Sequence, residues 1–462
     1  MTYNRIRAVV MGLGGHGGGV AAARFLAARG AVVTVTDVAG EKSLRASLRG
    51  LAGCPVASFR LGEHRVEDFR CADLVVVNPA VRPGDSNVEA ARCSGARITS
   101  EIELFLDHCP SSIVAVTGTN GKSTTAAMIA TAGEAAGHRP WLGGNIGRSL
   151  LPELHNIRTD DLVVLELSSF QLHWLSEQAR LPSIAVFTGC TPNHLDWHHS
   201  FAEYKNAKRR LIERKSGKQT VIVDPKERCF AAEVDQICAP LETHRLPPLR
   251  LVGEHNRRNA AQAASAAVAA GCDPEKVLVG LSQFRGLPHR LETVAVVRGR
   301  TFVNDSQSTT PESTIAALEA LGDRNCWLLA GGADKGTAVD LLAQTIAKRA
   351  AGTALFGATA AKIAAALREA EGELDRNGGC RRGREQTCPT RSVRPTFQTD
   401  SLATALKWCW RQSVKGDVIL LSPACSSQDQ YYDCSERAAD FVAHIEQIRD
   451  ECCHPSTAER ML

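Results

Sequence analysis

Short runs rich in β-branched residues alternate with Ala- and Leu-rich stretches along most of this 462-residue chain. Such alternation is typical of parallel α/β architecture, in which a helix returns the chain to the same edge of a sheet after each strand. The length exceeds one ordinary hydrophobic core, so we expect two or three domains. The expected strands are Arg7–Met11, Val32–Thr36, Leu74–Val77, Ile113–Thr117, Leu162–Leu165, Ile184–Phe187, Val221–Val223, Val294–Val297, Thr301–Asn304, Cys326–Ala330 and Val418–Leu421.

Two segments with turn-forming residues interrupt this alternating pattern. A Cys-Pro-Ser-Ser turn at residues 109–112 precedes a new strand, and Gly286–Arg290 has the Gly and Pro content of a hinge. We therefore expect an α/β protein with domains at residues 1–108, 109–288 and 289–462. Residues 372–394 are rich in Gly, Arg and Pro and lack apolar periodicity, which predicts a solvent-exposed insertion.

The N-terminal residues run directly into the first expected strand and lack the apolar core and cleavage site of a signal peptide. No segment approaches the roughly 18 apolar residues that a membrane-spanning helix needs. The 54 basic residues nearly balance the 50 acidic ones, which does not favour binding to nucleic acid or to an anionic membrane. We expect a cytoplasmic protein that binds neither.

The strongest local pattern is a glycine-rich turn between the strand Ile113–Thr117 and an expected helix, Thr124–Gly133. Glycines let backbone N–H groups approach phosphate oxygens, the helix N-terminus adds partial positive charge, and Lys122 adds a full charge. The Ser123 hydroxyl can bind Mg²⁺. The spacing is shorter than the generic G-x-x-x-x-G-K-[ST] pattern, so a plain glycine turn is the alternative. The predicted phosphate-binding residues are Gly118, Thr119, Asn120, Gly121, Lys122, Ser123 and Thr124.

Acidic and histidine side chains follow the next two strands. Glu166 lies at a strand end, where a carboxylate can reach the same Mg²⁺ as Ser123, although a solvent-exposed acid is the simpler alternative. His194 and His198 have a spacing that suits zinc only on a helix, and this stretch is expected to be a loop. The sixteen cysteines show no paired C-x-x-C spacing either, so we favour magnesium over zinc.

A second glycine turn follows the first expected strand. Gly12, Gly14 and Gly17 have the G-x-G-x-x-G spacing of dinucleotide-binding turns, and Asp37 follows about 20 residues after the last glycine. An oxidoreductase that uses NAD is one interpretation. The same geometry also suits the pyrophosphate of any nucleotide diphosphate, so this turn alone is weak evidence for redox chemistry.

The combination of motifs resembles the Mur ligases, from about Arg7 to about Ile448. The segments that carry this resemblance are Thr117–Thr124, Gly143–Gly147, Leu165–Gln171, Asn193–Asp196, Tyr204–Lys208, Gly253–Asn259, Gly286–Arg290, Asn304–Ser306, Gly331–Gly336 and Leu421–Ser427. The resemblance implies a Rossmann-like UDP-binding domain, a central P-loop ATPase domain and a C-terminal Rossmann-like domain. It also implies a monomer that uses ATP and Mg²⁺ to add an amino acid to a UDP-muramoyl substrate.

The resemblance implies catalytic roles for Lys122, His194 and Lys208. Ser123 and Glu166 would bind one Mg²⁺ and His194 a second, while Lys208 would be carbamylated and act as a metal ligand. The other implied contacts are Gly14, Gly17, Asp37, Asn145 and Ser168 for the UDP-sugar, Asn259, Arg290 and Asp305 for ATP, and Lys335 and Ser427 for the incoming amino acid.

Within the family, the pattern resembles members that add glutamate, by default D-glutamate, to UDP-N-acetylmuramoyl-L-alanine. Gln307 replaces a usual lysine, and Gln428 and Cys434 replace apolar or aromatic residues, so L-glutamate or another acidic amino acid remains open. His16 also replaces a small hydroxyl residue. A non-catalytic nucleotide-binding regulator is a further alternative, as is a folate polyglutamate synthetase, although those synthetases lack the first domain.

Overall fold

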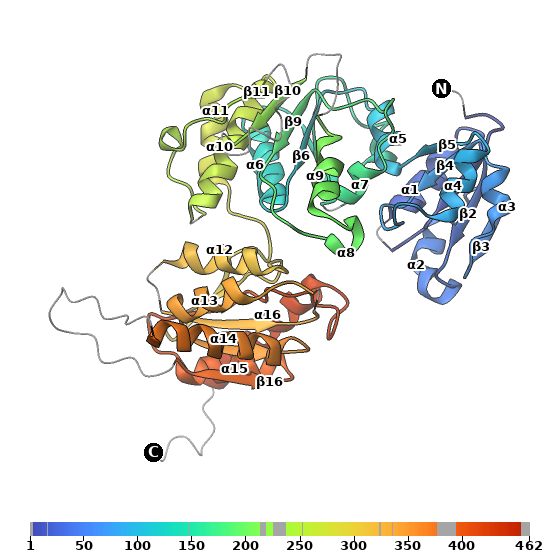
Figure 1. The fold of residues 1–462 in the computed structure, drawn as a ribbon. Coiled ribbons are helices and arrows are strands. Elements are labelled where there is room, and N and C mark those ends of the chain that lie inside the picture. Colours follow the sequence, from blue (N-terminus) through green and yellow to red (C-terminus); the bar gives the residue numbers. More distant parts are fainter. Residues whose placement is uncertain are drawn as a thin grey trace. The chain divides into compact units, whose positions relative to one another are not determined.

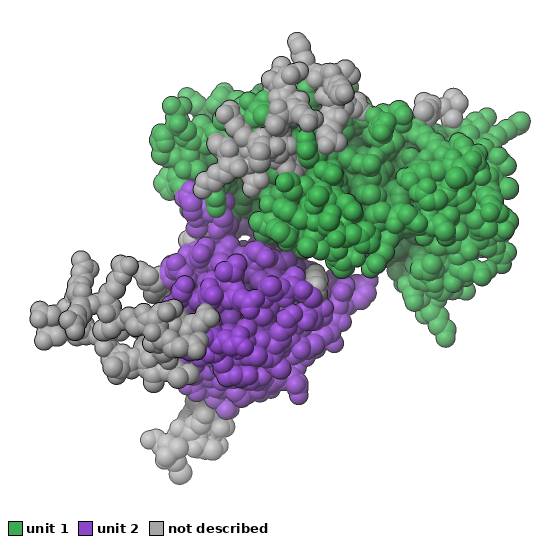
Figure 2. All heavy atoms as spheres, viewed as in Figure 1, with its two compact units in different colours: residues 1–249, 256–284 green, residues 250–255, 285–462 purple. Residues whose placement is uncertain are grey.

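The computed structural model describes residues 3–15, 17–146, 148–212, 219–224, 237–251, 253–322, 325–334, 336–376 and 394–453. Three sheets with flanking helices follow one another along the chain, as Figure 1 shows, which confirms the predicted three-domain α/β fold. By their internal contacts the residues divide into two compact units (Figure 2). Unit 1 contains residues 1–249 and 256–284, and unit 2 contains residues 250–255 and 285–462.

The first sheet of unit 1 has five parallel strands in the order β3-β2-β1-β4-β5. Its inner strands are Val-rich and buried, as expected where helices cover both faces of a parallel sheet. The strand order reverses at β1, and open α/β sheets bind ligands at such a reversal. The elements are β1 (Arg7–Met11), α1 (Gly18–Ala27), β2 (Val32–Asp37), α2 (Glu41–Gly50), β3 (Ser58–Leu61), α3 (Val66–Arg70), β4 (Leu74–Val77), α4 (Ser86–Cys93), β5 (Arg97–Thr99) and α5 (Glu101–His108).

The second sheet of unit 1 has six parallel strands in the order β11-β10-β9-β6-β8-β7. Its central strand, β6, lies between β8 and β9, so this sheet also reverses its order at the strand that precedes the phosphate turn. The elements are β6 (Ile113–Thr117), α6 (Lys122–Ala135), β7 (Pro140–Gly144), η1 (Leu151–Glu153), β8 (Leu162–Glu166), α7 (Ser169–His173), β9 (Ile184–Phe187), α8 (Leu195–His198), α9 (Phe201–Arg209), β10 (Thr220–Val223), β11 (Ile237–Cys238), α10 (Glu254–Ala269) and α11 (Pro274–Gln283).

One hydrophobic cluster runs through both sheets of unit 1. It contains Val33 from β2, Phe105 from α5 and Val163 from β8, all almost fully buried. The two sheets therefore share a core, and α5 lies at their junction.

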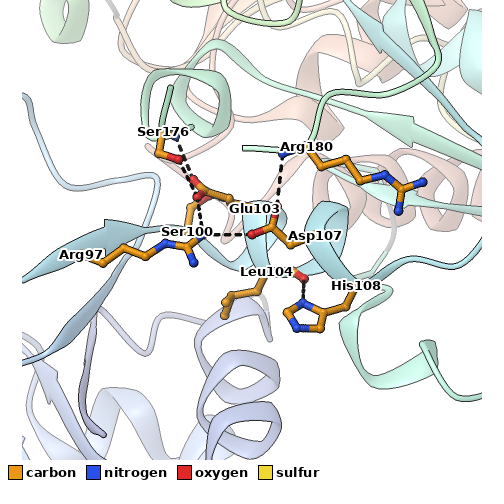
Figure 3. A network of polar contacts seen from close by, with 8 residues as sticks. All are labelled: Arg97, Ser100, Glu103, Leu104, Asp107, His108, Ser176 and Arg180. Carbon is orange, nitrogen blue, oxygen red and sulfur yellow. Dashed lines mark hydrogen bonds and ion pairs between the residues drawn. The ribbon is translucent and has the colours of Figure 1, made fainter. Parts of the chain in front are cut away.

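A charged network also joins the two sheets at α5 (Figure 3). Arg97 of β5 donates from Nη2 to Glu103 Oε1 and to Asp107 Oδ2, both at 2.9 Å. Ser176, which follows α7, donates to Glu103 from its backbone N–H at 2.8 Å and from its hydroxyl at 2.7 Å. Because Glu103 is fully buried, losing these partners would leave an uncompensated charge. The network therefore stabilises the junction.

Unit 2 contains the third sheet, in the order β12-β13-β17-β14-β15-β16. β12 pairs antiparallel to β13, and the other neighbours are parallel. Arg298 and Gly299 form the hairpin turn with φ values of 45° and 75°, a backbone that two-residue hairpins favour. The elements are β12 (Glu292–Val297), β13 (Arg300–Asn304), α12 (Pro311–Leu321), β14 (Cys326–Gly331), α13 (Asp340–Arg349), β15 (Ala350–Phe356), α14 (Ala360–Arg376), β16 (Thr396–Thr399), α15 (Leu402–Gln412), β17 (Val418–Leu421) and α16 (Cys434–Cys453).

Some boundaries differ from the expected ones. α6 begins at Lys122, two residues before the expected start, because the glycine turn leads directly into the helix. α14 continues to Arg376, so the expected insertion at residues 372–394 begins within a helix, and its residues 377–393 lie outside the described part of the chain. Across the described residues, no helix has the length and apolar character needed to cross a membrane.

Candidate active site

The carboxyl edge of the second sheet places several predicted residues next to one another. Val116 of β6 pairs with Glu166 at the end of β8, and Thr117 pairs with Phe187 at the end of β9. The segments that follow these strands therefore begin at the same edge, where open α/β sheets bind nucleotides.

Two glycines of the turn after β6 tolerate no side chain. Gly118 has a φ of 152°, and a Cβ atom there would lie 2.0 Å from Thr188 Oγ1. Gly121 has a φ of 81°, and its Cβ atom would lie 2.5 Å from Asn259 Oδ1. Both backbone conformations are ones that L side chains rarely adopt. The turn therefore requires glycine, and Asn259, a predicted ATP contact, packs directly against it.

Hydrogen bonds hold the rest of this turn in place. Thr119 donates its N–H to the Gly189 carbonyl at 2.8 Å, and its hydroxyl donates to the Thr191 carbonyl at 3.0 Å. Lys122 Nζ donates to the Thr119 carbonyl at 2.8 Å. α6 starts at Lys122, and the first N–H groups of a helix have no acceptor within the helix. A helix start of this kind, beside an ammonium group, suits a phosphate.

Glu166 has a buried carboxylate oxygen without a partner. The residue is 2% exposed, and its Oε1 accepts a hydrogen bond from Asn145 Nδ2 at 2.9 Å. Its Oε2 is buried and has no hydrogen-bond partner in the described part of the chain. Such an atom is costly unless a cation or a donor approaches it. The residues thus fit a divalent cation near the turn, with an oxygen ligand of the kind that Mg²⁺ prefers.

No group of three His, Cys, Asp or Glu side chains in the described residues gathers as a metal site. An ion beside Glu166 would therefore need oxygen ligands from phosphate, water or hydroxyl groups. Mg²⁺ commonly takes most of its ligands from water and substrate phosphates.

Lys208 of α9 lies beneath the phosphate turn. The side chain is 1% exposed, and its Nζ donates to the Gly118 carbonyl at 2.6 Å. Burial, reinforced by the positive charge of Lys122, lowers the pKa of Lys208 well below the usual range for lysine, while Glu166 opposes this shift. Lys208, Lys122 and Glu166 thus interact electrostatically, and burial disfavours the charged ammonium form of Lys208 relative to that of an exposed lysine.

The segment after β9 forms the one-turn helix α8, so the prediction of a loop was wrong. His194 caps this helix with a φ of 56°, and the helix is anchored by Trp197, which is 7% exposed. The His194 ring meets Phe170 edge-on, with 4.8 Å between centroids. His198 Nε2 lies 2.9 Å from Ser169 Oγ, and burial lowers the pKa of His198 to about 4. His198 is therefore held in the buried interior next to α7.

The glycine turn of the first sheet is held by side chains on both sides. Asp37 accepts from the Gly14 N–H at 3.0 Å and from the Ala39 N–H at 2.8 Å. Ser47 donates its hydroxyl to the Gly14 carbonyl. Gly17 has a φ of 83° and precedes α1. Asp37 thus shapes the turn itself, a role that the sequence pattern did not predict. The replaced position in this turn, His16, lies outside the described residues.

Ser168, a predicted substrate contact, caps α7. Its hydroxyl accepts from the Gln171 N–H at 3.2 Å, and the Gln171 side chain accepts from the Ser168 N–H at 3.0 Å. This capping box accounts for the position of Ser168. Its contact with a substrate stays a prediction.

Unit 2 places Arg290 and Asp305 near each other. Asp305 follows β13, is 4% exposed, and accepts from the Leu291 N–H at 3.1 Å and the Ser422 hydroxyl at 2.7 Å. Burial raises the pKa of Asp305 to about 6, although neighbouring donors and the charge of Arg290 act against this rise.

The predicted amino-acid pocket is described only in part. Ser427 is 4% exposed, and its carbonyl accepts from the Tyr431 N–H at 2.9 Å, whereas Lys335 lies outside the described residues. Among the replaced positions, Gln428 is exposed, Gln307 donates its N–H to the His289 carbonyl at 3.1 Å, and Cys434 begins α16.

Arg437 is a residue that sequence reasoning missed. Its guanidinium is fully buried, and Nη2 donates to the Ser306 carbonyl at 2.9 Å while Nη1 donates to the Cys425 carbonyl at 3.2 Å. It thereby joins the segments that follow β13 and β17. An arginine in a helix is usually exposed, so the sequence gives no local signal for this role.

Each of the two parallel sheets has a glycine turn at its carboxyl edge, and one of these turns has a buried acid and a buried amine beside it. This arrangement defines a class of α/β proteins built to bind two phosphate-containing ligands. The family comparison narrows this class. The sequence profile of the Mur ligase MurD-like N-terminal domain matches residues 6–100, that of the Mur ligase middle domain matches residues 116–240, and that of the Mur ligase glutamate ligase domain matches residues 289–425. The chain belongs to the Mur ligase family.

Curated relatives are similar over nearly the whole chain. The UDP-N-acetylmuramoylalanine–D-glutamate ligase of Roseiflexus sp. is 36% identical, over 96% of this chain and 98% of the relative. The ligase of the same name from Symbiobacterium thermophilum is 34% identical over the same shares. These similarities do not favour the nicotinamide-dependent oxidoreductase alternative.

Solved structures share the fold at low sequence identity. The UDP-N-acetylmuramate-alanine ligase of Thermotoga maritima has a TM-score of 0.59 and 18% identity, over 96% of this chain and all of that one. The MurF ligase of Thermotoga maritima, solved in complex with ADP, has a TM-score of 0.58 and 15% identity, over 91% and 95% of the two chains. At these identities the likeness concerns the fold alone.

Proposed function

We propose that this protein is an ATP-dependent acid–amino-acid ligase that joins glutamate to UDP-N-acetylmuramoyl-L-alanine during peptidoglycan precursor synthesis. The names of its relatives favour D-glutamate. We further propose that it acts as a cytoplasmic monomer with domains at residues 1–108, 109–288 and 289–462. One observation carries the proposal: the partnerless Oε2 of Glu166 lies at the same sheet edge as the Gly118–Lys122 turn.

In the first step, the substrate carboxylate attacks the γ-phosphorus of ATP, which forms an acyl phosphate and releases ADP. Two anions must meet, so positive charge at the site lowers the barrier. In this chain Lys122, Ser123 and the N–H groups at the start of α6 provide that charge and those donors. Ser123 and Glu166 would hold one magnesium ion and His194 a second, and these ions would supply further charge neutralisation.

Lys208 supports this site in a second way. Its lowered pKa increases the fraction of neutral amine relative to an exposed lysine, and a neutral amine is the form that reacts with CO₂ to give a carbamate. The carbamate that family resemblance implies is therefore chemically accessible to this lysine. It would convert a buried amine into an anionic oxygen ligand beside the turn.

In the second step, the amine of glutamate attacks the activated carbonyl carbon, and phosphate leaves as the amide forms. We assign Gly14, Gly17, Asp37, Asn145 and Ser168 to the UDP-sugar substrate, and Lys335 and Ser427 to glutamate. We assign Asn259 of unit 1 and Arg290 and Asp305 of unit 2 to ATP.

The proposal is tested by incubating the full chain with UDP-N-acetylmuramoyl-L-alanine, ATP, Mg²⁺ and D-glutamate. We expect ADP, phosphate and the glutamyl product in equal amounts, and no phosphate when either the UDP substrate or glutamate is omitted. Parallel reactions with L-glutamate and D-aspartate measure the specificity that Gln307, Gln428 and Cys434 leave open. Phosphate release without a new amide product would reject the proposal.

A further inference from the structure

Trp174 inserts from the second sheet's helices into the core of the first sheet. The residue follows α7 and is 4% exposed. It belongs to a hydrophobic cluster whose other buried members, among them Val75 and Val88, all come from residues 9–96. Its ring is therefore part of the first sheet's packing, although its backbone belongs to the second sheet's domain.

Two indole N–H groups reach the segment that follows β4, residues 78–81, which we call the 78–81 loop. Trp174 Nε1 donates to the Val81 carbonyl at 3.2 Å. Trp197 of α8 donates from Nε1 to the Ala80 carbonyl at 3.5 Å, a longer and weaker bond. The two side chains thus hold adjacent carbonyl groups of one loop.

Asn78 links the same loop to the glycine turn of the first sheet. Its Nδ2 donates to the Gly12 carbonyl at 3.0 Å, and its Oδ1 accepts from the Ala80 N–H at 2.9 Å. A Cβ atom on Gly12 would lie 2.6 Å from Asn78 Cβ, and one on Gly14 would lie 3.1 Å from Asn78 Nδ2. The turn is therefore packed on the Asn78 side chain, and a shift of the loop moves the turn.

Trp197 also contacts an aromatic residue that packs against His194, one of the predicted metal ligands. Trp197 meets Phe170 edge-on at 4.9 Å between centroids, and Phe170 meets His194 at 4.8 Å. A continuous set of contacts thus connects His194, Trp197, the 78–81 loop and Asn78 with Gly12.

We infer that Trp174 and Trp197 are positioning residues for the sugar-nucleotide substrate. They fix the 78–81 loop, and through Asn78 they hold the Gly12–Gly17 turn in the shape that accepts a pyrophosphate. This inference rests on the proposed function, because it takes the first glycine turn as the UDP site. Neither indole is assigned a contact with substrate, so the effect on binding is indirect.

The test measures equilibrium binding of UDP-N-acetylmuramoyl-L-alanine by calorimetry, with no ATP present. Trp174→Phe keeps an aromatic ring in the core but removes the indole donor together with the volume of the pyrrole ring. We expect this variant to bind the UDP ligand about 3- to 10-fold more weakly, as loss of one hydrogen bond predicts. Its affinity for ADP should stay within about twofold of wild type, since α6 and its turn are not touched.

Trp327→Phe is the matched control. Trp327 is 8% exposed in unit 2 and donates from Nε1 to Asp417 Oδ2 at 2.9 Å, so the substitution also removes one buried indole donor. We expect it to lower the melting temperature without changing the affinity for the UDP ligand. Equal weakening by the Trp174 and Trp327 variants would overturn the inference, because it would reflect general loss of stability.

A double-mutant cycle tests the path through Asn78. If the loop transmits the effect, Asn78→Ala and Trp174→Phe together weaken binding less than the product of their separate effects. Independent effects, or wild-type affinity in Trp174→Phe, would overturn the inference while leaving the proposed function intact. Failure of the wild-type protein to bind the UDP ligand would instead reject the proposed function. If Trp174→Phe does not fold, Asn78→Ala alone must show the selective loss of UDP-ligand binding.

Discussion

Lys208 Nζ donates a hydrogen bond of 2.6 Å to the carbonyl oxygen of Gly118, the first glycine of the phosphate turn. The two residues are 90 positions apart in sequence. Tyr204, one helical turn earlier in α9, also places its hydroxyl 3.0 Å from Thr119 Oγ1. α9 is therefore the element that supports the turn from below. Substitutions in α9 and in the turn should affect the same step.

Replacing Lys208 should disable catalysis without unfolding the protein. We expect Lys208→Ala to lower kcat by about 100-fold or more, because it removes the side chain that holds the Gly118 carbonyl and that would bind the metal ion as a carbamate. Acetate or formate should restore part of the rate if a carbamate is the active form. Lys205→Ala in the same helix is the control, since Lys205 packs over the Phe201 ring, and it should keep nearly full activity. Steady-state kinetics with ATP and the UDP substrate provide the measurement. A kcat of Lys208→Ala close to that of wild type would contradict a catalytic role for Lys208.

Adding one methyl group to Gly118 should block the nucleotide site. Gly118→Ala combines a strained φ with a contact of 2.0 Å to Thr188, so the turn must distort. We expect ATP affinity to fall by at least 10-fold. Gly137→Ala, at a φ of 92° with no atom within 4 Å of the added Cβ, is the control. This control substitution should cost about 1–2 kcal/mol of stability and leave ATP affinity unchanged. Titration with a fluorescent ATP analogue compares the two variants. Equal ATP affinities of the two variants would refute the steric argument.

Asp37→Asn should weaken binding of the UDP substrate selectively. The Asp37 carboxylate accepts from two backbone N–H groups, and an amide offers only one acceptor atom and turns an N–H₂ group toward the other donor. Loss of one charge-assisted bond predicts about 10- to 100-fold weaker binding of UDP-N-acetylmuramoyl-L-alanine, with ATP affinity retained. Asp73→Asn, which alters an exposed pair with Arg7 in the same sheet, should bind normally. Calorimetry tests both, and equal losses for the two variants would argue against the assigned role.

The stability of unit 2 should depend on pH through Asp305. Burial raises the pKa of Asp305 from 3.8 to about 6 in the folded protein. The folded state therefore binds a proton more tightly than the unfolded state, so this contribution to stability is complete below about pH 4 and is lost as the pH rises through 6. Between pH 5 and pH 7.5 the loss amounts to about 1–2 kcal/mol.

Asp305→Asn carries no titrating proton and should not show this loss. The free energy of unfolding of the variant, relative to wild type, should therefore increase by about 1–2 kcal/mol from pH 5 to pH 7.5. Urea denaturation at the two pH values provides the measurement, with Asp400→Asn, an exposed aspartate of the same unit, as control. A constant difference between variant and wild type would contradict the shifted pKa.

Strands that are buried and rich in β-branched residues could be predicted from the sequence, because their own composition indicates them. Arg7–Met11, Ile113–Thr117 and Val418–Leu421 appear with the expected bounds. Edge strands such as β3 and β16 were missed, since half-exposed runs like Ser58–Leu61 lack an apolar signal. The antiparallel pairing of β12 was also missed, because direction depends on the short turn at Arg298 rather than on strand composition.

The residues of the phosphate turn could be predicted because their spacing reflects backbone geometry. Residues that act through tertiary packing could not. Asn78, Trp174 and Arg437 are far in sequence from the groups that they hold, and only the fold brings them there. The helix α8 was missed because the left-handed His194 that begins it has no sequence signature of its own.

The central claim is that the turn from Gly118 to Ser123 binds the phosphates of ATP. It is tested most directly by measuring, on the same Lys122→Ala protein, the affinity for a non-hydrolysable ATP analogue with Mg²⁺ and the affinity for UDP-N-acetylmuramoyl-L-alanine. We predict that the ATP analogue binds at least 10-fold more weakly while the UDP ligand binds as it does to wild type. Unchanged affinity for the ATP analogue, or loss of UDP-ligand binding alone, would contradict the assignment of the two glycine turns.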